Sequence, residues 1–180
     1  VQEDEEDVDG QIELANRALE KKPDGLILAT GSFEALSEVA AKACDMGIPV
    51  ISIDSDVNEK RVLSFIATDN KEAGKKAGNK LVEIAGTKCR VAILSFSSGS
   101  RNVEQREEGL MSIILQYPQI EVVCREYCLS NIDAANNITR KIISDHGEID
   151  ALVALNEITS LGAAEAVREM NLAGKTKIIA

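Results

Sequence analysis

The chain has 180 residues, enough for one α/β domain or two small lobes, and it is 44% hydrophobic but only 3% aromatic. Its net charge is −10, and six carboxylates fall within the first nine residues. We interpret this acidic run as a solvated lead-in, and its repulsion of phosphate argues against direct nucleic-acid contact by this segment. No apolar stretch approaches the roughly 20 residues of a membrane-spanning helix, and no signal peptide is visible.

Helical and extended patterns alternate along the first part of the chain. Apolar residues at helical spacing predict a helix over 11–22 with Asp9 as its N-cap, and a second helix that Ser32 caps and Gly47 closes. Short apolar runs rich in branched residues predict three strands, over 26–29, 50–53 and 62–67.

The same alternation continues to the end of the chain. Asp69 and Glu72 have the spacing of a capping box, and they open a helix in which Gly74 and Gly78 are small enough for close packing against a neighbour. The apolar face of this helix is predicted at Ala73, Ala77, Leu81 and Ile84. Further helices are predicted over 103–117, 134–146 and 159–170, and further strands over 91–96, 121–127, 151–155 and 177–180.

Strands that alternate with helices of about ten or more residues indicate right-handed βαβ units. The predicted fold is therefore α/β, with parallel β-sheets that carry helices on both faces. The first helix has no clear strand before it, and the sequence stops within an apolar run. We therefore expect both ends of the chain to be truncated.

Polar residues stand directly after several of the predicted strands. Asp54 and Ser55 follow the strand over 50–53, Asn156 follows the strand over 151–155, and Thr30 follows the first strand. In an open parallel sheet the ligand crevice lies beyond the carboxyl ends of the strands, so we expect function at this polar rim. We interpret the next carboxylate, Asp56, as a turn residue.

The sequence predicts no disulfide, no metal site, no cofactor and no catalytic group. Cys124 and Cys128 fall on one strand, about 13 Å apart, and we expect all four cysteines to be small buried apolar residues. A single histidine without paired cysteines disfavours zinc. His146 at a helix end is better explained by the helix dipole than by general-base chemistry. Residues 97–100 lack the lysine and spacing of a phosphate-binding loop.

Short motifs in a fixed order resemble the type I periplasmic binding protein superfamily, and its ribose- and galactose-binding members look most similar. The matching stretches are PDGLIL at 23–28, GIPVISID at 47–54, IATDN at 66–70 with AG at 73–74, REEG at 106–109, IDA at 149–151, NE at 156–157 and LGA at 161–163. The resemblance implies two Rossmann-like lobes with a ligand cleft between them. Residues 1–67 would belong to the N-terminal lobe and 68–180 to the C-terminal lobe.

The resemblance also implies ligand-binding residues. Asp54 stands where the family uses a carboxylate to grip sugar hydroxyls, and the alternative is a turn or cap residue. Ser55 follows where ribose-binding members tend to have arginine, which departs from the ribose pattern. Asn156 matches a family ligand position, and the alternative is a helix N-cap. Asn70 is a further candidate ligand residue, whereas the role of helix N-cap is sufficient to explain Asp69.

Arg106 is the remaining candidate ligand residue. Its guanidinium could hold adjacent hydroxyls or a carboxylate, and the alternative is a surface salt bridge with Glu107 or Glu108. Arg101 in the preceding loop is a weaker candidate. The family often stacks an aromatic ring on the sugar, but no aromatic residue stands in the loop after Tyr127.

The resemblance implies an extracytoplasmic solute-binding protein, in the periplasm or as a cell-surface lipoprotein. It would capture a sugar or similar polar solute and deliver it to the permease of an ABC transporter. The alternative is the ligand-sensing effector domain of a lactose-repressor-type transcription regulator or of a membrane receptor. Four cysteines and no signal sequence fit a cytosolic regulator, whereas the regions around Arg106 and Asn156 look more like the transport proteins. Among the alternative functions, an enzyme with a flavodoxin-like sheet is the least favoured.

Overall fold

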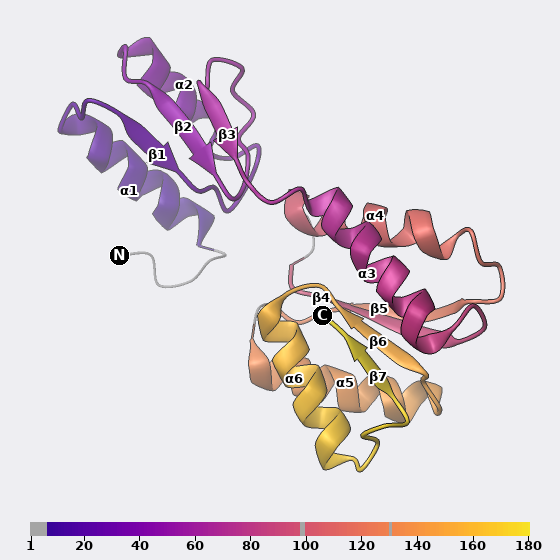
Figure 1. The fold of residues 1–180 in the computed structure, drawn as a ribbon. Helices are drawn as coiled ribbons and strands as arrows, with labels where there is room; N and C mark the ends of the chain where they lie inside the picture. The colour runs from indigo at the N-terminus through magenta and orange to yellow at the C-terminus, as the bar shows by residue number, and fades with distance from the viewer. Residues whose placement is uncertain (1–6, 98–99, 130) are drawn as a thin grey trace. The chain divides into compact units, whose positions relative to one another are not determined.

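The computed structural model describes residues 7–97, 100–129 and 131–180 (Figure 1). It divides into two compact units, Val1–Thr68 and Asp69–Ala180, which we call unit 1 and unit 2 and describe separately. The boundary expected between the two lobes was at residues 67 and 68. Most of the acidic run, Glu3 to Glu6, lies outside the described residues.

Unit 1 is a three-stranded parallel sheet in the order β1-β2-β3. Its elements are α1 (Val8–Glu20), β1 (Leu26–Leu28), α2 (Ser37–Asp45), β2 (Val50–Ile53) and β3 (Ser64–Ile66). Leu19 of α1 and Ala40 of α2 share one apolar core with Leu28 and Val50 of the sheet. Side chains alternate between the two faces of a strand, and Ile27 on the other face is 67% exposed. The described helices of unit 1 therefore cover one face of its sheet.

Two predicted caps in unit 1 differ from the observed ones. Asp7, not Asp9, is the N-cap of α1, because its Oδ1 accepts a hydrogen bond from the Gly10 amide at 2.8 Å. The Ser32 hydroxyl accepts from the Ala35 amide at 3.3 Å in a turn, but α2 itself begins later, at Ser37. The difference at Ser32 arises because serine satisfies turn amides as readily as helix amides.

Unit 2 is a four-stranded parallel sheet in the order β5-β4-β6-β7. Its helices are α3 (Asn70–Ala85), α4 (Arg101–Ile114), α5 (Ile132–His146) and α6 (Glu157–Glu169), and its strands are β4 (Arg90–Ser95), β5 (Glu121–Tyr127), β6 (Ala151–Ala154) and β7 (Lys177–Ile179). Figure 1 shows α3 and α4 on one face of this sheet and α5 and α6 on the other. The α/β fold with parallel sheets is confirmed, and in unit 2 helices cover both faces as predicted.

The strands of unit 2 supply both of its cores. Val91 and Ile93 of β4 belong to the core under α3 and α4, whereas Ala92 and Leu94 face α5 and α6. All four are fully buried. This explains why β4 reads as a continuous apolar run, which is the pattern of a strand covered on both faces.

Glycines set the distance between α3 and α4. A Cβ atom on Gly74 would lie 1.9 Å from the carbonyl oxygen of Arg106, and one on Gly109 would lie 2.0 Å from that of Lys71. Gly78 similarly lies against the Ile113 side chain. The predicted close packing at Gly74 and Gly78 is confirmed. The buried face of α3 differs from the predicted one, since its members are Asn70, Gly74, Gly78 and Leu81 while Ile84 is 42% exposed.

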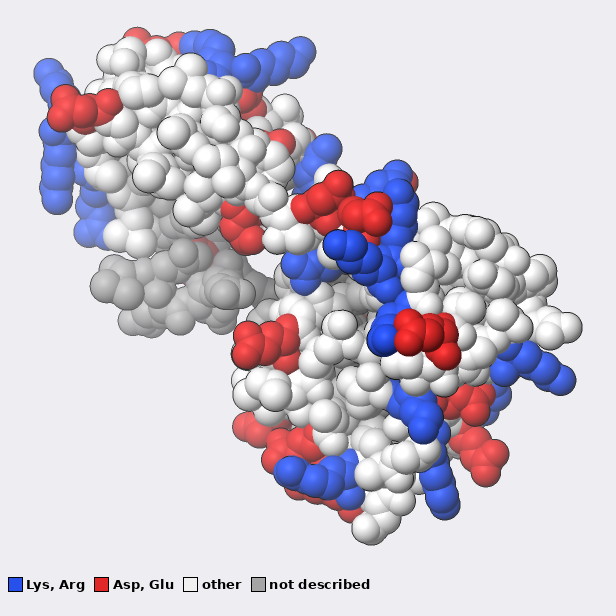
Figure 2. All heavy atoms as spheres, viewed as in Figure 1, with Lys and Arg blue, Asp and Glu red and all other residues white. Residues whose placement is uncertain are grey.

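Charged side chains of both signs lie beside one another on the face of unit 2 seen in Figure 2. Lys75 pairs with Glu72 at 3.3 Å along α3, and Lys71 pairs with Glu108 on α4. Exposed pairs of this kind contribute only about 0–1 kcal/mol each. The stability of the unit therefore rests mainly on its apolar cores.

The four cysteines are free thiols. Cys89 and Cys128 are buried, as expected, whereas Cys44 and Cys124 are only partly buried. Burial raises the pKa of the Cys89 and Cys124 thiols, which keeps them protonated and unreactive near neutral pH. None of the helices in the described parts of the chain is long and apolar enough to span a bilayer. Across residues 7–97, 100–129 and 131–180 there is no group of three or more metal-ligating side chains.

Candidate functional site

Asp54 stands at the carboxyl end of β2 in unit 1, with an exposed side chain. Its backbone has φ +59°, and its amide donates to the carbonyl of Ile66 at 2.9 Å. The carboxylate accepts from the Ser55 hydroxyl at 3.5 Å. Aspartate tolerates this left-handed region better than most residues, and such positions occur at turns and at functional sites alike. The structure therefore places Asp54 and Ser55 at the polar rim, and their contact with a ligand stays a prediction.

Buried polar groups hold the turn that follows Asp54. The Asp56 carboxylate accepts from the Val57 amide at 2.8 Å and from the Ser52 hydroxyl at 3.4 Å. The Thr30 hydroxyl donates to the Asp56 carbonyl at 2.5 Å. Both Ser52 and Thr30 are buried. Asp56 is thus a turn residue, as expected, and Thr30 acts on the same turn.

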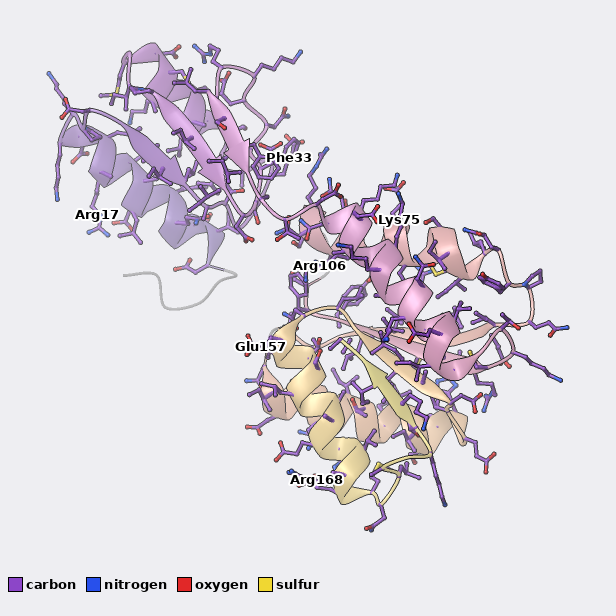
Figure 3. The ribbon with its side chains drawn as sticks, viewed as in Figure 1. Arg17, Phe33, Lys75, Arg106, Glu157 and Arg168 are labelled. Carbon is purple, nitrogen blue, oxygen red and sulfur yellow. The ribbon has the colours of Figure 1, made fainter. Side chains whose placement is uncertain are left out.

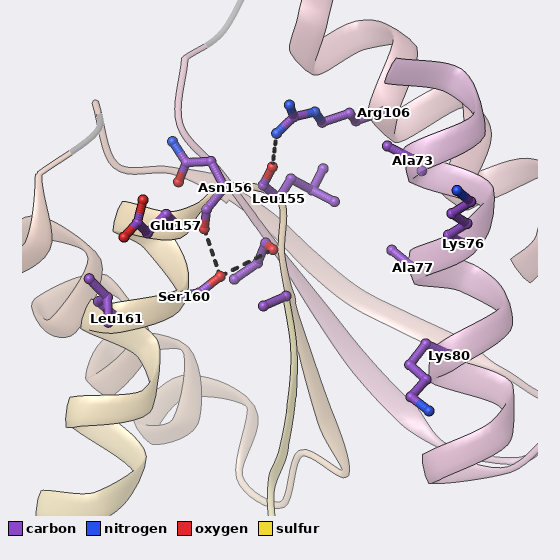
Figure 4. Close-up of a pocket in the computed structure, with 13 residues that line it drawn as sticks. Ala73, Lys76, Ala77, Lys80, Arg106, Leu155, Asn156, Glu157, Ser160 and Leu161 are labelled. Carbon is purple, nitrogen blue, oxygen red and sulfur yellow. Dashed lines mark hydrogen bonds between the residues drawn. The ribbon is translucent and has the colours of Figure 1, made fainter. Parts of the chain in front are cut away.

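A pocket of about 740 Å³ opens at the corresponding edge of unit 2, where β6 ends and α6 begins (Figure 4). One wall is formed by α3, with small residues and the side chains of Lys76 and Lys80, and Asn156 and Glu157 lie on the opposite wall. Arg106 of α4 also lines it. Figure 3 shows Arg106 and Glu157 at the same end of this unit. The structure thus brings two of the predicted ligand residues, Arg106 and Asn156, together around one pocket.

Three contacts within unit 2 hold the guanidinium of Arg106. Its Nε donates to Oδ1 of Asn70 at 2.8 Å, and Nη1 donates to the carbonyl of Leu155, as drawn in Figure 4. The guanidinium carbon lies 5.9 Å from the centre of the Phe96 ring, within the range of a cation–π contact. This positive charge is therefore fixed in orientation rather than mobile.

The carboxylates next to Arg106 in sequence have other partners. Glu108 pairs with Lys71 on α3. Glu107 is buried, accepts a hydrogen bond from Ser95 and lies 3.8 Å from Arg125. The predicted alternative, a salt bridge of Arg106 with Glu107 or Glu108, is therefore not observed among these described residues. The guanidinium of Arg106 instead donates to the side-chain amide of Asn70 and the backbone carbonyl of Leu155.

Asn156 is the N-cap of α6. Its Oδ1 accepts from the Thr159 amide at 2.8 Å, and the Thr159 hydroxyl accepts from the Asn156 amide at 3.2 Å, which completes a capping box. The N-cap alternative is therefore observed. A cap through the side-chain oxygen does not test contact with a ligand, so the ligand role of Asn156 stays a prediction.

Asn70 and Asp69 begin α3 but have different surroundings. Asp69 Oδ1 accepts from the Glu72 amide at 2.9 Å, which is the capping role expected for it. The Glu72 carboxylate is 3.3 Å from Lys75 Nζ, and no reciprocal bond completes a capping box within the described residues. Asn70 is only 3% exposed and bridges two side chains of α4. A direct ligand contact by Asn70 stays a prediction.

The sequence analysis missed two polar residues of α4, Asn102 and Glu107. Glu107 shares an apolar stripe with Val103, Leu110 and Ile114, and that spacing was the signal that it faces the sheet. Burial and the neighbouring Glu107 together raise the pKa of the Tyr127 phenol at the end of β5. Asn102 lies one helical turn before Arg106, on the side that faces α3.

Comparison with known proteins agrees with this architecture. The family described as "Periplasmic binding protein domain" matches residues 1–180. The D-ribose/D-allose-binding protein of Pseudomonas aeruginosa is 27% identical over 182 residues, which is 98% of this chain but 57% of that protein.

Solved structures show the same relationship. An ABC transporter solute-binding protein from Agrobacterium vitis with bound D-fucose has a TM-score of 0.92 and 28% identity over 97% of this chain and 61% of its own. A sugar transporter from Clostridium phytofermentans has a TM-score of 0.90 and 32% identity over 98% and 65%. The chain thus spans less than two thirds of each of these proteins, from 57% to 65% of their lengths. The family match and these structures establish that the chain belongs to the type I periplasmic binding protein superfamily.

Proposed function

We propose that the full-length protein is an extracytoplasmic solute-binding protein that captures a sugar or a similar polar solute and passes it to the permease of an ABC importer. It binds and releases this solute unchanged and carries out no turnover. Family membership supports the proposal, as do relatives whose names record ribose, allose and fucose as ligands. The family name also supports location in the periplasm or at the cell surface.

The observation that carries the proposal is the convergence of Arg106 and Asn156 on one pocket at the carboxyl edge of a parallel sheet. A planar guanidinium held in one orientation can donate two parallel hydrogen bonds to adjacent oxygens. Vicinal hydroxyls of a sugar present oxygens in this arrangement. We propose that Arg106 and Asn156 bind such hydroxyls from unit 2.

We further propose that Asp54 and Ser55 are ligand residues at the carboxyl edge of the sheet of unit 1. An ionised carboxylate accepts hydrogen bonds only, whereas a guanidinium only donates them. A sugar hydroxyl is both donor and acceptor, so it can satisfy both kinds of group. Neutral polyols and sugars fit this combination better than anions, which Asp54 would repel.

A thermal-shift screen of the full-length protein against pentoses, hexoses and small polyols tests this function. Ligand at 100 times its Kd stabilises the folded state by about 2.7 kcal/mol, which raises Tm by several degrees. Asp54→Ala should abolish the shift, while its own Tm should fall only by the cost of placing alanine in the left-handed backbone of this position, because Asp54 lies outside the core. Asp24→Ala is the matched control, since Asp24 is also exposed but precedes β1 at the opposite edge of the same sheet. The proposal is wrong if no such solute shifts Tm, or if Asp54→Ala keeps the shift.

A further inference from the structure

A chain of polar side chains runs between the first turns of α3 and α4. Asn70 Nδ2 donates to Oδ1 of Asn102 at 3.1 Å, and Asn70 Oδ1 accepts from Nε of Arg106 at 2.8 Å. Asn70 is 3% exposed and Asn102 is 8% exposed. A buried amide destabilises the fold unless its groups are hydrogen-bonded. An asparagine buried between two helices therefore calls for a structural or functional reason.

The helix crossing places this chain with little freedom. Gly74 touches the carbonyl of Arg106, and Gly109 touches that of Lys71, so each helix backbone rests on a glycine of the other. Gly74 lies one helical turn after Asn70 on α3, and its contact with the carbonyl of Arg106 fixes the backbone of Arg106 at that level of the helix. Closely packed backbones cannot slide without large losses of packing, and the distance between Asn70 and Arg106 is therefore set by the fold.

We propose that Asn70 and Asn102 are positioning residues for Arg106, and this inference rests on the ligand role proposed for Arg106 above. Asn102 orients the amide of Asn70, and Asn70 then presents its oxygen to Arg106 Nε. The carbonyl of Leu155 holds Nη1 from another side, but it belongs to the backbone. Asn70 is thus a side-chain partner of the guanidinium that a substitution can remove.

The chemistry of this arrangement favours asparagine. Its side chain combines a donor and an acceptor on one short stem, as a bridge between an acceptor and a charged donor requires. Arginine has many rotamers in solution, and a site that already restricts them loses less entropy when the ligand binds. On this proposal Asn70 raises affinity through Arg106, in place of the direct ligand contact that the sequence predicted for it.

A double-mutant cycle on the full-length protein tests this mechanism. The variants are Asn70→Ala, Arg106→Ala and the double substitution, and sugar affinity is measured by titration calorimetry. Asn70→Ala should weaken binding about tenfold, the scale of one hydrogen bond to a charged group. In the Arg106→Ala background it should have no further effect, because Asn70 acts only through Arg106. Asn79→Ala is the control, since Asn79 is exposed on the same helix.

Two further measurements separate positioning from general stability. Asn70→Asp keeps the acceptor for Arg106 Nε and should restore most of the affinity. The NMR signal of the Arg106 Nε–H group in ligand-free protein should be sharp and slow to exchange in the wild type. It should broaden in Asn70→Ala and, to a lesser degree, in Asn102→Ala.

The outcomes distinguish this inference from the proposed function. An equal loss of affinity in both backgrounds would show that Asn70 contacts the sugar and would overturn positioning. An unchanged Nε–H signal in Asn70→Ala would overturn it as well. If no sugar binds the wild type, the proposed function fails, while broadening of the Nε–H signal in Asn70→Ala would still support the positioning of Arg106.

Discussion

Replacing Gly74 by alanine tests how closely α3 and α4 must approach. The added Cβ would lie 1.9 Å from the Arg106 carbonyl oxygen and 2.9 Å from the Leu110 amide nitrogen. A C–H···O contact needs about 3.3 Å, so the helices would have to separate by roughly 1.4 Å at this point. Both neighbours are backbone atoms and cannot rotate away.

The expected cost follows from two opposing terms. A gap of about 0.5–1 Å already removes a quarter to a half of the dispersion energy of the atoms that line it. Overpacking typically costs about 1–3 kcal/mol, and the rigid backbone contact favours the upper end of that range. Alanine recovers about 1 kcal/mol because it favours helix more than glycine does. We therefore expect Gly74→Ala to destabilise unit 2 by about 2 kcal/mol.

Differential scanning calorimetry measures this effect directly. A loss of about 2 kcal/mol corresponds to a decrease in Tm of roughly 8 °C for a unit of this size. Gly25→Ala is the control, because its Cβ would meet nothing closer than 3.7 Å and its backbone needs no left-handed conformation. A Gly74→Ala protein with Tm equal to or above that of the wild type would refute the reasoning, since helix propensity alone predicts that result.

Two more predictions concern Asn156 and Glu59. Asn156→Ser keeps an oxygen that can cap α6, so Tm should change little, whereas loss of the amide donor should weaken sugar binding about tenfold. Calorimetric titration together with a melt checks both, and unchanged affinity would remove Asn156 from the ligand set. Hydrogen bonds from Arg61 lower the pKa of Glu59 from 4.5 to about 2. A lowered folded-state pKa stabilises the protein above about pH 4.5, and this contribution is lost as the pH falls toward 2. Glu59→Gln should therefore flatten Tm against pH in that window, and an unchanged slope would contradict the assignment.

Local patterns in the sequence determined the order and type of the elements. The strand predicted over 121–127 is observed as β5 with the same bounds, and the strand over 50–53 is observed as β2. Apolar runs between turn signals also locate β6, which is buried along its whole length, because a strand covered on both faces needs an unbroken apolar sequence. Asp54 and Asn156 were likewise placed after strands from position alone, whereas their ligand roles were implied by the family resemblance and stay predictions.

Helix starts were less determined by the sequence. Asp7 and Asp9 are both good N-cap residues, and only the backbone geometry decides which one accepts the amide hydrogen bond. Ser32 illustrates the same ambiguity, because a serine caps a turn and a helix with the same bond.

The surroundings of Arg106 were decided by the tertiary structure. Sequence proximity suggested Glu107 and Glu108 as its partners, but a residue next in sequence on a helix points about 100° away. The observed partners, Asn70 and the Leu155 carbonyl, come from elements distant in the chain. Asn70 meets Arg106 because Gly74 and Gly109 let α3 and α4 approach until their backbones touch, and no local pattern specifies which helix will be the neighbour.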